Sequence, residues 1–340
     1  MAFALTLFVG GAAVIAYVGT RMTTLADRLA DRTGLGEAFI GALFLGAATS
    51  LPGITASVTA AAAGQPQMAL ANAIGGIAAQ TAFLAIADIT YRKANLEHAA
   101  TSVPNMLQAS LLIVLLGLMV LTMAGPSFDI FGIHPLTMAL PILYLFGLHM
   151  IRHAGTKPMW QPLMTEQTRP DEEDEPKTPA MADTWMWLKF VGAALLVIAA
   201  GYGVTRATIV LAEGWGFNQS VAGAIFTAIA TSLPELVTSI AAVRRGALTL
   251  AVSGVIGGNC FDTLFAAVAD AVYRPGSLYH AATAQTGNRE LSLIAASITM
   301  TAVLLLGLLR REKYGPAGIG FESVAVLVIY LGVMVLLGVG

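Results

Sequence analysis

Thr231-Ser232-Leu233-Pro234-Glu235 places a proline and a carboxylate inside a stretch that is otherwise apolar enough to cross a membrane. Proline lacks a backbone N–H, and its ring clashes with the carbonyl four residues earlier, so a helix must bend or open here. A carboxylate at membrane depth is costly unless it faces a polar cavity or a cation. The freed carbonyl, two hydroxyls and one carboxylate form an all-oxygen ligand set, which hard cations prefer. The stretch therefore predicts a broken membrane helix with a cation site. The alternative is a proline kink whose glutamate reaches the membrane surface.

The composition is that of a membrane protein. The chain has 340 residues, of which 56% are hydrophobic and 11% are charged, whereas soluble domains carry about 25% charged residues. The net charge of -2 and the lack of a long basic run exclude a nucleic-acid-binding surface. The lone Cys260 has no partner for an internal disulfide and is predicted to be a small core residue. Residues 1–19 have no basic start and no cleavage site, which predicts a retained first membrane helix.

Ten apolar stretches are long enough to cross the hydrocarbon core, which takes about 20 residues. We predict an all-α polytopic membrane protein with ten transmembrane helices at 2–20, 36–62, 67–90, 105–124, 133–152, 185–210, 218–242, 247–272, 290–309 and 321–339. The proline-rich segment 153–184 separates the first five from the last five and contains the acidic run 171–175. This composition predicts a solvated linker, since it cannot bury enough apolar surface to fold alone.

The two halves repeat one another. A shift of 182 in the numbering superimposes residues 8–101 on 190–283 without a gap, and 27 of the 61 positions from 41 to 101 are identical. The sequence therefore predicts two five-helix repeats, 1–152 and 185–340. Because five is an odd number, the second repeat enters the membrane from the opposite side, which predicts inverted topology. With the N-terminus outside, 15 of the 18 Lys and Arg residues lie on the cytoplasmic side, together with the linker.

Each half contributes a broken helix followed by a glycine-rich helix. In transporters with inverted repeats, cations bind near the midplane where such helices meet. Gly75-Gly76 and Gly257-Gly258 are predicted to let helices pack closely. Asp262 lies four residues after the second glycine pair, on the same helix face, and is predicted to point toward Glu235.

An aspartate and an arginine recur four residues apart near the end of each glycine-rich helix. They are Asp88 with Arg92, and Asp270 with Arg274. This spacing predicts ion pairs within one helix at the membrane interface. A proton relay is the alternative.

Residues 41–83 and 223–265, each with Thr-Ser-Leu-Pro and then Ile-Gly-Gly, resemble the α-1 and α-2 repeats of the cation/Ca2+ exchanger superfamily, which includes Na+/Ca2+ and H+/Ca2+ exchangers. The resemblance covers nearly the whole chain and implies ten helices in two inverted halves, with a cytoplasmic loop between the fifth and sixth. The family's acidic position in the first repeat falls on Gly53, so one carboxylate of the pattern is missing. The cation ligands that the resemblance implies are Glu235, Asp262, Thr231, Ser232, Thr49, Ser50 and Gln80.

Two carboxylates match the charge of one Ca2+ or two monovalent cations. Calcium affinity falls when the ligands carry less negative charge. We expect an alternating-access antiporter of the plasma membrane, or of a bacterial inner membrane, that exchanges Ca2+ for Na+ or H+. It would be a transporter without catalytic residues or a cofactor. Its partners would be inorganic cations and the lipid bilayer, not nucleic acid, and the sequence carries no signal for an oligomeric state. Two alternatives are an antiporter of Na+ or K+ against protons on the same fold, and a non-transporting ion sensor that reports through the acidic linker.

Overall fold

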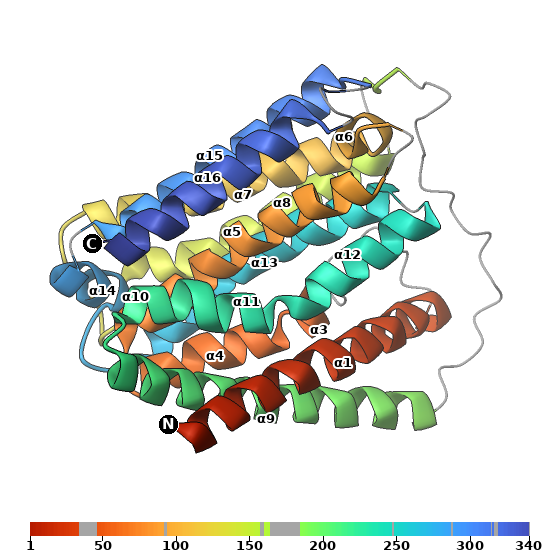
Figure 1. The fold of residues 1–340 in the computed structure, drawn as a ribbon. Helices are drawn as coiled ribbons and strands as arrows, with labels where there is room; N and C mark the ends of the chain where they lie inside the picture. Colours follow the sequence, from red (N-terminus) through yellow and green to blue (C-terminus); the bar gives the residue numbers. More distant parts are fainter. Residues whose placement is uncertain are drawn as a thin grey trace.

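The chain folds into a bundle of helices in the computed structural model, which describes residues 1–33, 46–91, 94–156, 160–163, 184–246, 248–286, 288–313, 315 and 319–339 (Figure 1). No β-strand occurs within these ranges. The long helices are α1 (Ala2–Thr33), α5 (Pro66–Thr90), α7 (Val103–Ala124), α8 (Pro135–Thr156), α9 (Thr184–Trp215), α13 (Leu248–Val272), α15 (Arg289–Arg310) and α16 (Phe321–Val339). The shorter ones are α3 (Gly46–Thr49), α4 (Leu51–Ala62), α6 (Leu96–Ala99), α10 (Gln219–Val221), the π-helix η2 (Ala222–Thr227), α11 (Ala228–Thr231), α12 (Leu233–Arg245) and α14 (Leu278–Thr286).

The helices are arranged in tiers around α5. Helices α1 and α9 lie side by side along one edge of the bundle, and α15 and α16 lie along the opposite edge (Figure 1). Helix α5 contacts α4, α12, α13, α15 and α16, and almost all of its residues are buried. A helix that is apolar all round belongs in the interior, so α5 is the central element against which both halves pack.

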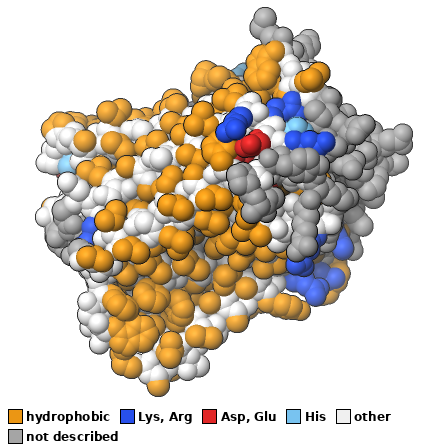
Figure 2. Space-filling view, turned by 45° about the horizontal axis from the view of Figure 1, so that its top comes forward, with side chains coloured by type: hydrophobic (Ala, Val, Ile, Leu, Met, Phe, Trp, Pro, Cys, Tyr) orange, Lys and Arg blue, Asp and Glu red, His pale blue; other side chains and the backbone are white. Residues whose placement is uncertain are grey.

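The outside of the bundle is apolar. Large side chains such as Leu121, Leu145 and Leu331 are exposed there, and hydrophobic side chains cover most of the face shown in Figure 2. Such an extended apolar surface marks contact with a membrane. Within the described residues, eight helices are long and apolar enough to cross a bilayer, and the total is nine if the bent pair 219–231 and 233–244 is one span. The prediction of an all-α integral membrane protein is confirmed.

The predicted count of ten spans is not confirmed within the described residues. The predicted span 36–62 is described only from residue 46 onward, where it forms α3 and α4. Its first part lies outside the described residues. The same is true of most of the predicted linker 153–184, because α8 ends at Thr156 and α9 begins at Thr184.

Asp270 ties three helices together near the end of α13. Its Oδ1 accepts a hydrogen bond from the backbone N–H of Leu278 at 2.7 Å, at the start of α14. Its Oδ2 accepts from the N–H of His134 at 2.9 Å and from the hydroxyl of Thr137 at 2.5 Å, at the start of α8. The predicted ion pair between Asp270 and Arg274 is therefore wrong, because both oxygens bind N-terminal groups of other helices, which need such acceptors. No ion pair joins these two residues in the described part of the chain.

Asp88, the counterpart of Asp270 in the first repeat, forms an equivalent junction. Its Oδ1 accepts from the N–H of Leu96 at 2.7 Å at the start of α6, and its Oδ2 accepts from the hydroxyl of Ser323 at 2.8 Å in α16. Its predicted partner, Arg92, lies outside the described residues. The repeated aspartate thus connects helices that are distant in sequence.

The first junction also contains two carboxyl groups that the second lacks. Glu97 in α6 and Glu322 in α16 are both almost fully buried, and their side chains are hydrogen-bonded to each other. Burial, together with the nearby charges of Asp88 and Glu322, raises the pKa of Glu97 well above its usual value.

Candidate cation site

Both broken helices are present at the repeated motif. Helix α11 ends at Thr231 and α12 begins at Leu233, and the helical segments 219–231 and 233–244 are bent by 46° relative to each other at this break. In the first repeat, α3 and α4 are separated in the same way at Ser50. The backbone angles agree closely, with φ -96° and ψ 8° at Ser232 and φ -81° and ψ -5° at Ser50. Because a proline lies in the first turn of α4 and of α12, the new helix begins where a missing N–H costs nothing.

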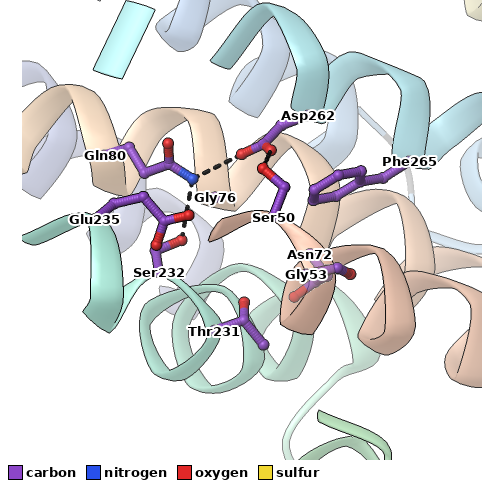
Figure 3. Close-up of a pocket in the computed structure, with 10 residues that line it drawn as sticks. All are labelled: Ser50, Gly53, Asn72, Gly76, Gln80, Thr231, Ser232, Glu235, Asp262 and Phe265. Carbon is purple, nitrogen blue, oxygen red and sulfur yellow. Dashed lines mark hydrogen bonds between the residues drawn. The ribbon is translucent and has the colours of Figure 1, made fainter. Parts of the chain in front are cut away.

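The two halves meet at Gln80 of α5 and Asp262 of α13, which are counterparts in the repeat. The Gln80 Nε2 donates to Asp262 Oδ2 at 2.6 Å. The hydroxyl of Ser50 donates to Asp262 Oδ1 at 2.6 Å, and Gln80 Nε2 also donates to the hydroxyl of Ser232 at 3.4 Å. The serine at each break therefore contacts the opposite half, and these contacts are equivalent under the shift of 182 (Figure 3).

Glu235 approaches the same point from the first turn of α12. Its side chain is 6% exposed and is hydrogen-bonded to that of Thr49, which comes from the other half. The hydroxyl of Thr231 instead donates to the carbonyl of Thr227 within its own helix at 2.9 Å. Thr231 still lines the cavity, farther from Glu235 than Ser232 in the view of Figure 3.

A small cavity separates these side chains. Its volume is about 10 Å3, which is room for the centre of about one water molecule or one dehydrated ion. Six of the seven predicted ligands line it, and the side chain of the seventh, Thr49, is hydrogen-bonded to Glu235. The lining comprises Ser50, Gly53, Asn72, Gly76, Gln80, Thr231, Ser232, Glu235, Asp262 and Phe265, with no Lys, Arg or His among these described residues.

Three residues that line this cavity each have a buried oxygen without a hydrogen-bond donor. These oxygens are Asn72 Oδ1, Gln80 Oε1 and Glu235 Oε2. A buried acceptor without a partner costs about 1 to 3 kcal/mol, so three around one small cavity are unfavourable unless a ligand supplies positive charge. Carbonyl and carboxylate oxygens of this kind are the ligands that Ca2+ and other hard cations take. These oxygen ligands therefore fit a cation.

The charge of the site comes from Glu235 and Asp262. In the described part of the chain, no three His, Cys, Asp or Glu side chains gather in a way that could hold a metal ion. A cation here would therefore be held by two carboxylates and several neutral oxygens.

Sequence reasoning assigned the glycines to packing, and this is correct for Gly75. A Cβ at Gly75 would lie 2.6 Å from the Cα of Ala224 in η2. Gly76 has a different role, because a Cβ there would lie 3.7 Å from the Ser232 hydroxyl and 3.8 Å from Asp262 Oδ2. It faces the cavity and leaves room in it.

Asn72 and Phe265 line the cavity although the sequence analysis did not single them out. The Nδ2 of Asn72 donates to the carbonyl of Gly53 at 3.0 Å and to the hydroxyl of Ser57 at 2.9 Å. An amide in an otherwise apolar span is a signal that was available. Its counterpart in the second repeat is Gly254, so the repeat comparison passed over it.

The chain is similar to known proteins along most of its length. A family model described as "Sodium/calcium exchanger protein" matches residues 3–148 and 185–339. The chain is 27% identical to the putative antiporter CaxA of Alkalimonas amylolytica over 308 residues, which are 90% of this chain and 92% of the relative. It is 30% identical to the sodium/calcium exchanger MaX1 of Methanosarcina acetivorans over 147 residues, which are 43% and 39% of the two chains.

Two solved structures share the fold. The sodium-calcium exchanger NCX_Mj superimposes with a TM-score of 0.64 at 17% identity, over 98% of both chains. The H+/Ca2+ exchanger CAX superimposes with a TM-score of 0.68 at 13% identity, over 98% of this chain and 84% of the other.

Proposed function

Because the chain belongs to the sodium/calcium exchanger protein family, we propose that it is an alternating-access antiporter that exchanges Ca2+ for Na+ or H+. Its membrane part comprises two five-helix repeats, residues 1–152 and 185–340, joined by the linker 153–184. We place it in the plasma membrane, or the inner membrane of a bacterium, with the N-terminus outside and the linker in the cytoplasm. The excess of Lys and Arg on the cytoplasmic side supports this orientation.

The observation that carries the proposal is the set of three unpartnered oxygens around the cavity between the two breaks. They come from both halves, since Asn72 and Gln80 belong to the first repeat and Glu235 to the second. A cation bound between them would have ligands from both halves. It would therefore sense any movement of one half against the other, which is what alternating access requires.

Coupling follows from charge. Two carboxylates buried without a counter-charge are strongly unfavourable in a low-dielectric interior. The empty site therefore resists the passage between outward-facing and inward-facing states, and the site filled with Ca2+, with monovalent cations or with protons does not. Each half-cycle then carries a cation, and the two fluxes are linked. The cations are cargo, and no cofactor takes part.

The test is ion flux in proteoliposomes that contain the purified protein. The native protein is expected to take up Ca2+ when an outward gradient of Na+ or H+ is imposed, and E235Q is expected to lose this uptake. The matched control is E213Q, which makes the same acid-to-amide change at an exposed residue at the end of α9. Uptake by E235Q equal to that of the native protein would refute the assignment of Glu235 as a ligand.

A second candidate is the exchange of Na+ or K+ for protons on the same fold. The observation that favours it is Gly53, which leaves the first break without a carboxylate. Direct Na+ binding distinguishes the two functions. Competition by Ca2+ supports calcium exchange, whereas Na+ binding that is insensitive to Ca2+ supports the second candidate.

A further inference from the structure

Gly53 and Glu235 occupy equivalent positions at the two breaks. Each follows its serine by three residues, Gly53 after Ser50 and Glu235 after Ser232. The two serines have nearly the same backbone angles, and both of their hydroxyls contact the opposite half. A side chain at position 53 would therefore enter the cavity from the side opposite to Glu235.

Phe265 fills the space that this side chain would take. A Cβ at Gly53 would lie 2.5 Å from Cε2 of the Phe265 ring and 3.2 Å from Cζ. Phe265 is 3% exposed, and its ring packs edge-to-face on Phe261 with 6.3 Å between centroids. Figure 3 shows the ring at the end of the cavity near Gly53, away from Glu235.

The backbone at Gly53 is also held in place. Its carbonyl accepts the hydrogen bond from Asn72, and its neighbour Pro52 packs against α9, where a Cβ at Gly201 would lie 3.0 Å from the Pro52 carbonyl oxygen. The start of α4 cannot easily withdraw from the ring. A carboxylate at position 53 therefore requires Phe265 to move or to become smaller.

We propose that Phe265 takes the place of the carboxylate that the repeat would put at position 53, and thereby limits the site to two negative charges and makes the exchange electroneutral. One Ca2+ then moves in one direction against two Na+ or two protons in the other, so that two positive charges cross each way. Phe265 is a specificity-determining residue in this scheme. The inference rests on the proposed function.

The first test needs no variant. An exchange that moves one net charge per cycle shifts its equilibrium Ca2+ gradient by about 50-fold for each 100 mV of membrane potential, which is about 2.3 kcal/mol. The equilibrium Ca2+ gradient of an electroneutral exchange does not depend on the membrane potential. The Ca2+ gradient reached by native proteoliposomes is measured with the potential clamped by valinomycin at two K+ gradients. We expect the same Ca2+ gradient at both membrane potentials. A change in this gradient near 50-fold per 100 mV would overturn the inference while leaving the proposed function intact. The absence of any Ca2+ exchange would instead refute the proposed function.

The second test examines Phe265 itself by Ca2+ titration of the purified protein. G53E alone is expected to gain no Ca2+ affinity, because the ring blocks the new side chain. The double variant G53E with F265A has both space and a third carboxylate, and is expected to bind Ca2+ on the order of tenfold more tightly than F265A alone. Equal tightening by G53E with the native ring in place would show that Phe265 does not exclude the carboxylate. Equal affinity of F265A and the double variant, with both proteins folded, would show that position 53 does not reach the site.

Discussion

Replacement of Asp262 by asparagine removes one of the two charges of the site with little change in shape. The carboxylate is 1% exposed and accepts hydrogen bonds of 2.6 Å from Ser50 and from Gln80. An amide keeps one acceptor oxygen, and the amide of Gln80 can turn so that its own oxygen meets the new N–H group. We therefore expect D262N to fold, and its effect to fall mainly on cation binding.

The magnitude follows from the charge of the ion. A divalent cation about 4 Å from a unit charge gains about 8 kcal/mol at an effective dielectric constant of 20. Desolvation of the carboxylate offsets several kcal/mol of this gain. A net loss of about 3 to 5 kcal/mol remains, which weakens Ca2+ binding by about 100-fold to 10,000-fold. S50A removes one hydrogen bond to the charged group, and we expect this to weaken the free energy of Ca2+ binding by about 1.5 to 3 kcal/mol.

Isothermal titration of the detergent-solubilised protein measures these affinities directly. The control is D129N, the same change at an exposed aspartate between α7 and α8, and it should bind Ca2+ as the native protein does. The order of affinities is expected to be native and D129N, then S50A, then D262N. If D262N retains its native melting temperature and binds Ca2+ within about threefold of the native protein, which is under 1 kcal/mol, Asp262 is not a cation ligand.

Three further changes test the packing and the helix junctions by thermal unfolding in detergent. G75A should destabilise the protein by about 1 to 3 kcal/mol, because its Cβ would meet the backbone of Ala224, and an unchanged melting temperature would refute the close contact. D270N keeps one acceptor oxygen, and if that oxygen serves His134 and Thr137 the backbone N–H of Leu278 is left without an acceptor, which should cost about 1 to 3 kcal/mol; no loss would contradict the junction. The raised pKa of Glu97 means that the folded protein holds this proton more tightly than the unfolded chain. That stabilisation is complete below the unfolded pKa and is lost as pH rises through the folded value. E97Q should therefore flatten the fall of the melting temperature with rising pH, and an unchanged slope would exclude Glu97 as its source.

The architecture and much of the candidate site were predictable because the same motif occurs in both halves of the sequence. The proline after Thr-Ser-Leu forces a break in any apolar helix, and the shift of 182 identifies the second break without knowledge of the fold. The same shift pairs Gln80 with Asp262, and the structure brings their side chains to 2.6 Å. A repeat thus provides information about contacts across the molecule that the pattern within one helix does not contain.

The remainder depends on contacts that neither periodicity nor the repeat encodes. Asp270 is four residues from Arg274, yet its oxygens bind groups at the starts of α8 and α14. The spacing reports only neighbours within one helix, whereas buried helix ends compete for the same acceptor more strongly than an exposed arginine does. Phe265 was missed for a related reason. Phenylalanine is an ordinary core residue, and its role becomes visible only when the ring is seen in the space beside Gly53.

The hydrogen bonds of the site follow the repeat, but its charges do not. Ser50 with Asp262, and Ser232 with Gln80, are equivalent contacts, yet Glu235 and Asp262 both belong to the second half and their counterparts are Gly53 and Gln80. The first half therefore contributes only neutral oxygens, whereas both carboxylates and the Phe265 ring come from the second half. Since a cation follows the negative charge, we expect it to remain with α12 and α13 while the first half opens and closes around it. Transfer of a carboxylate to position 53 would divide the charge between the halves, so the paired variant at positions 53 and 265 tests this division of roles together with the stoichiometry.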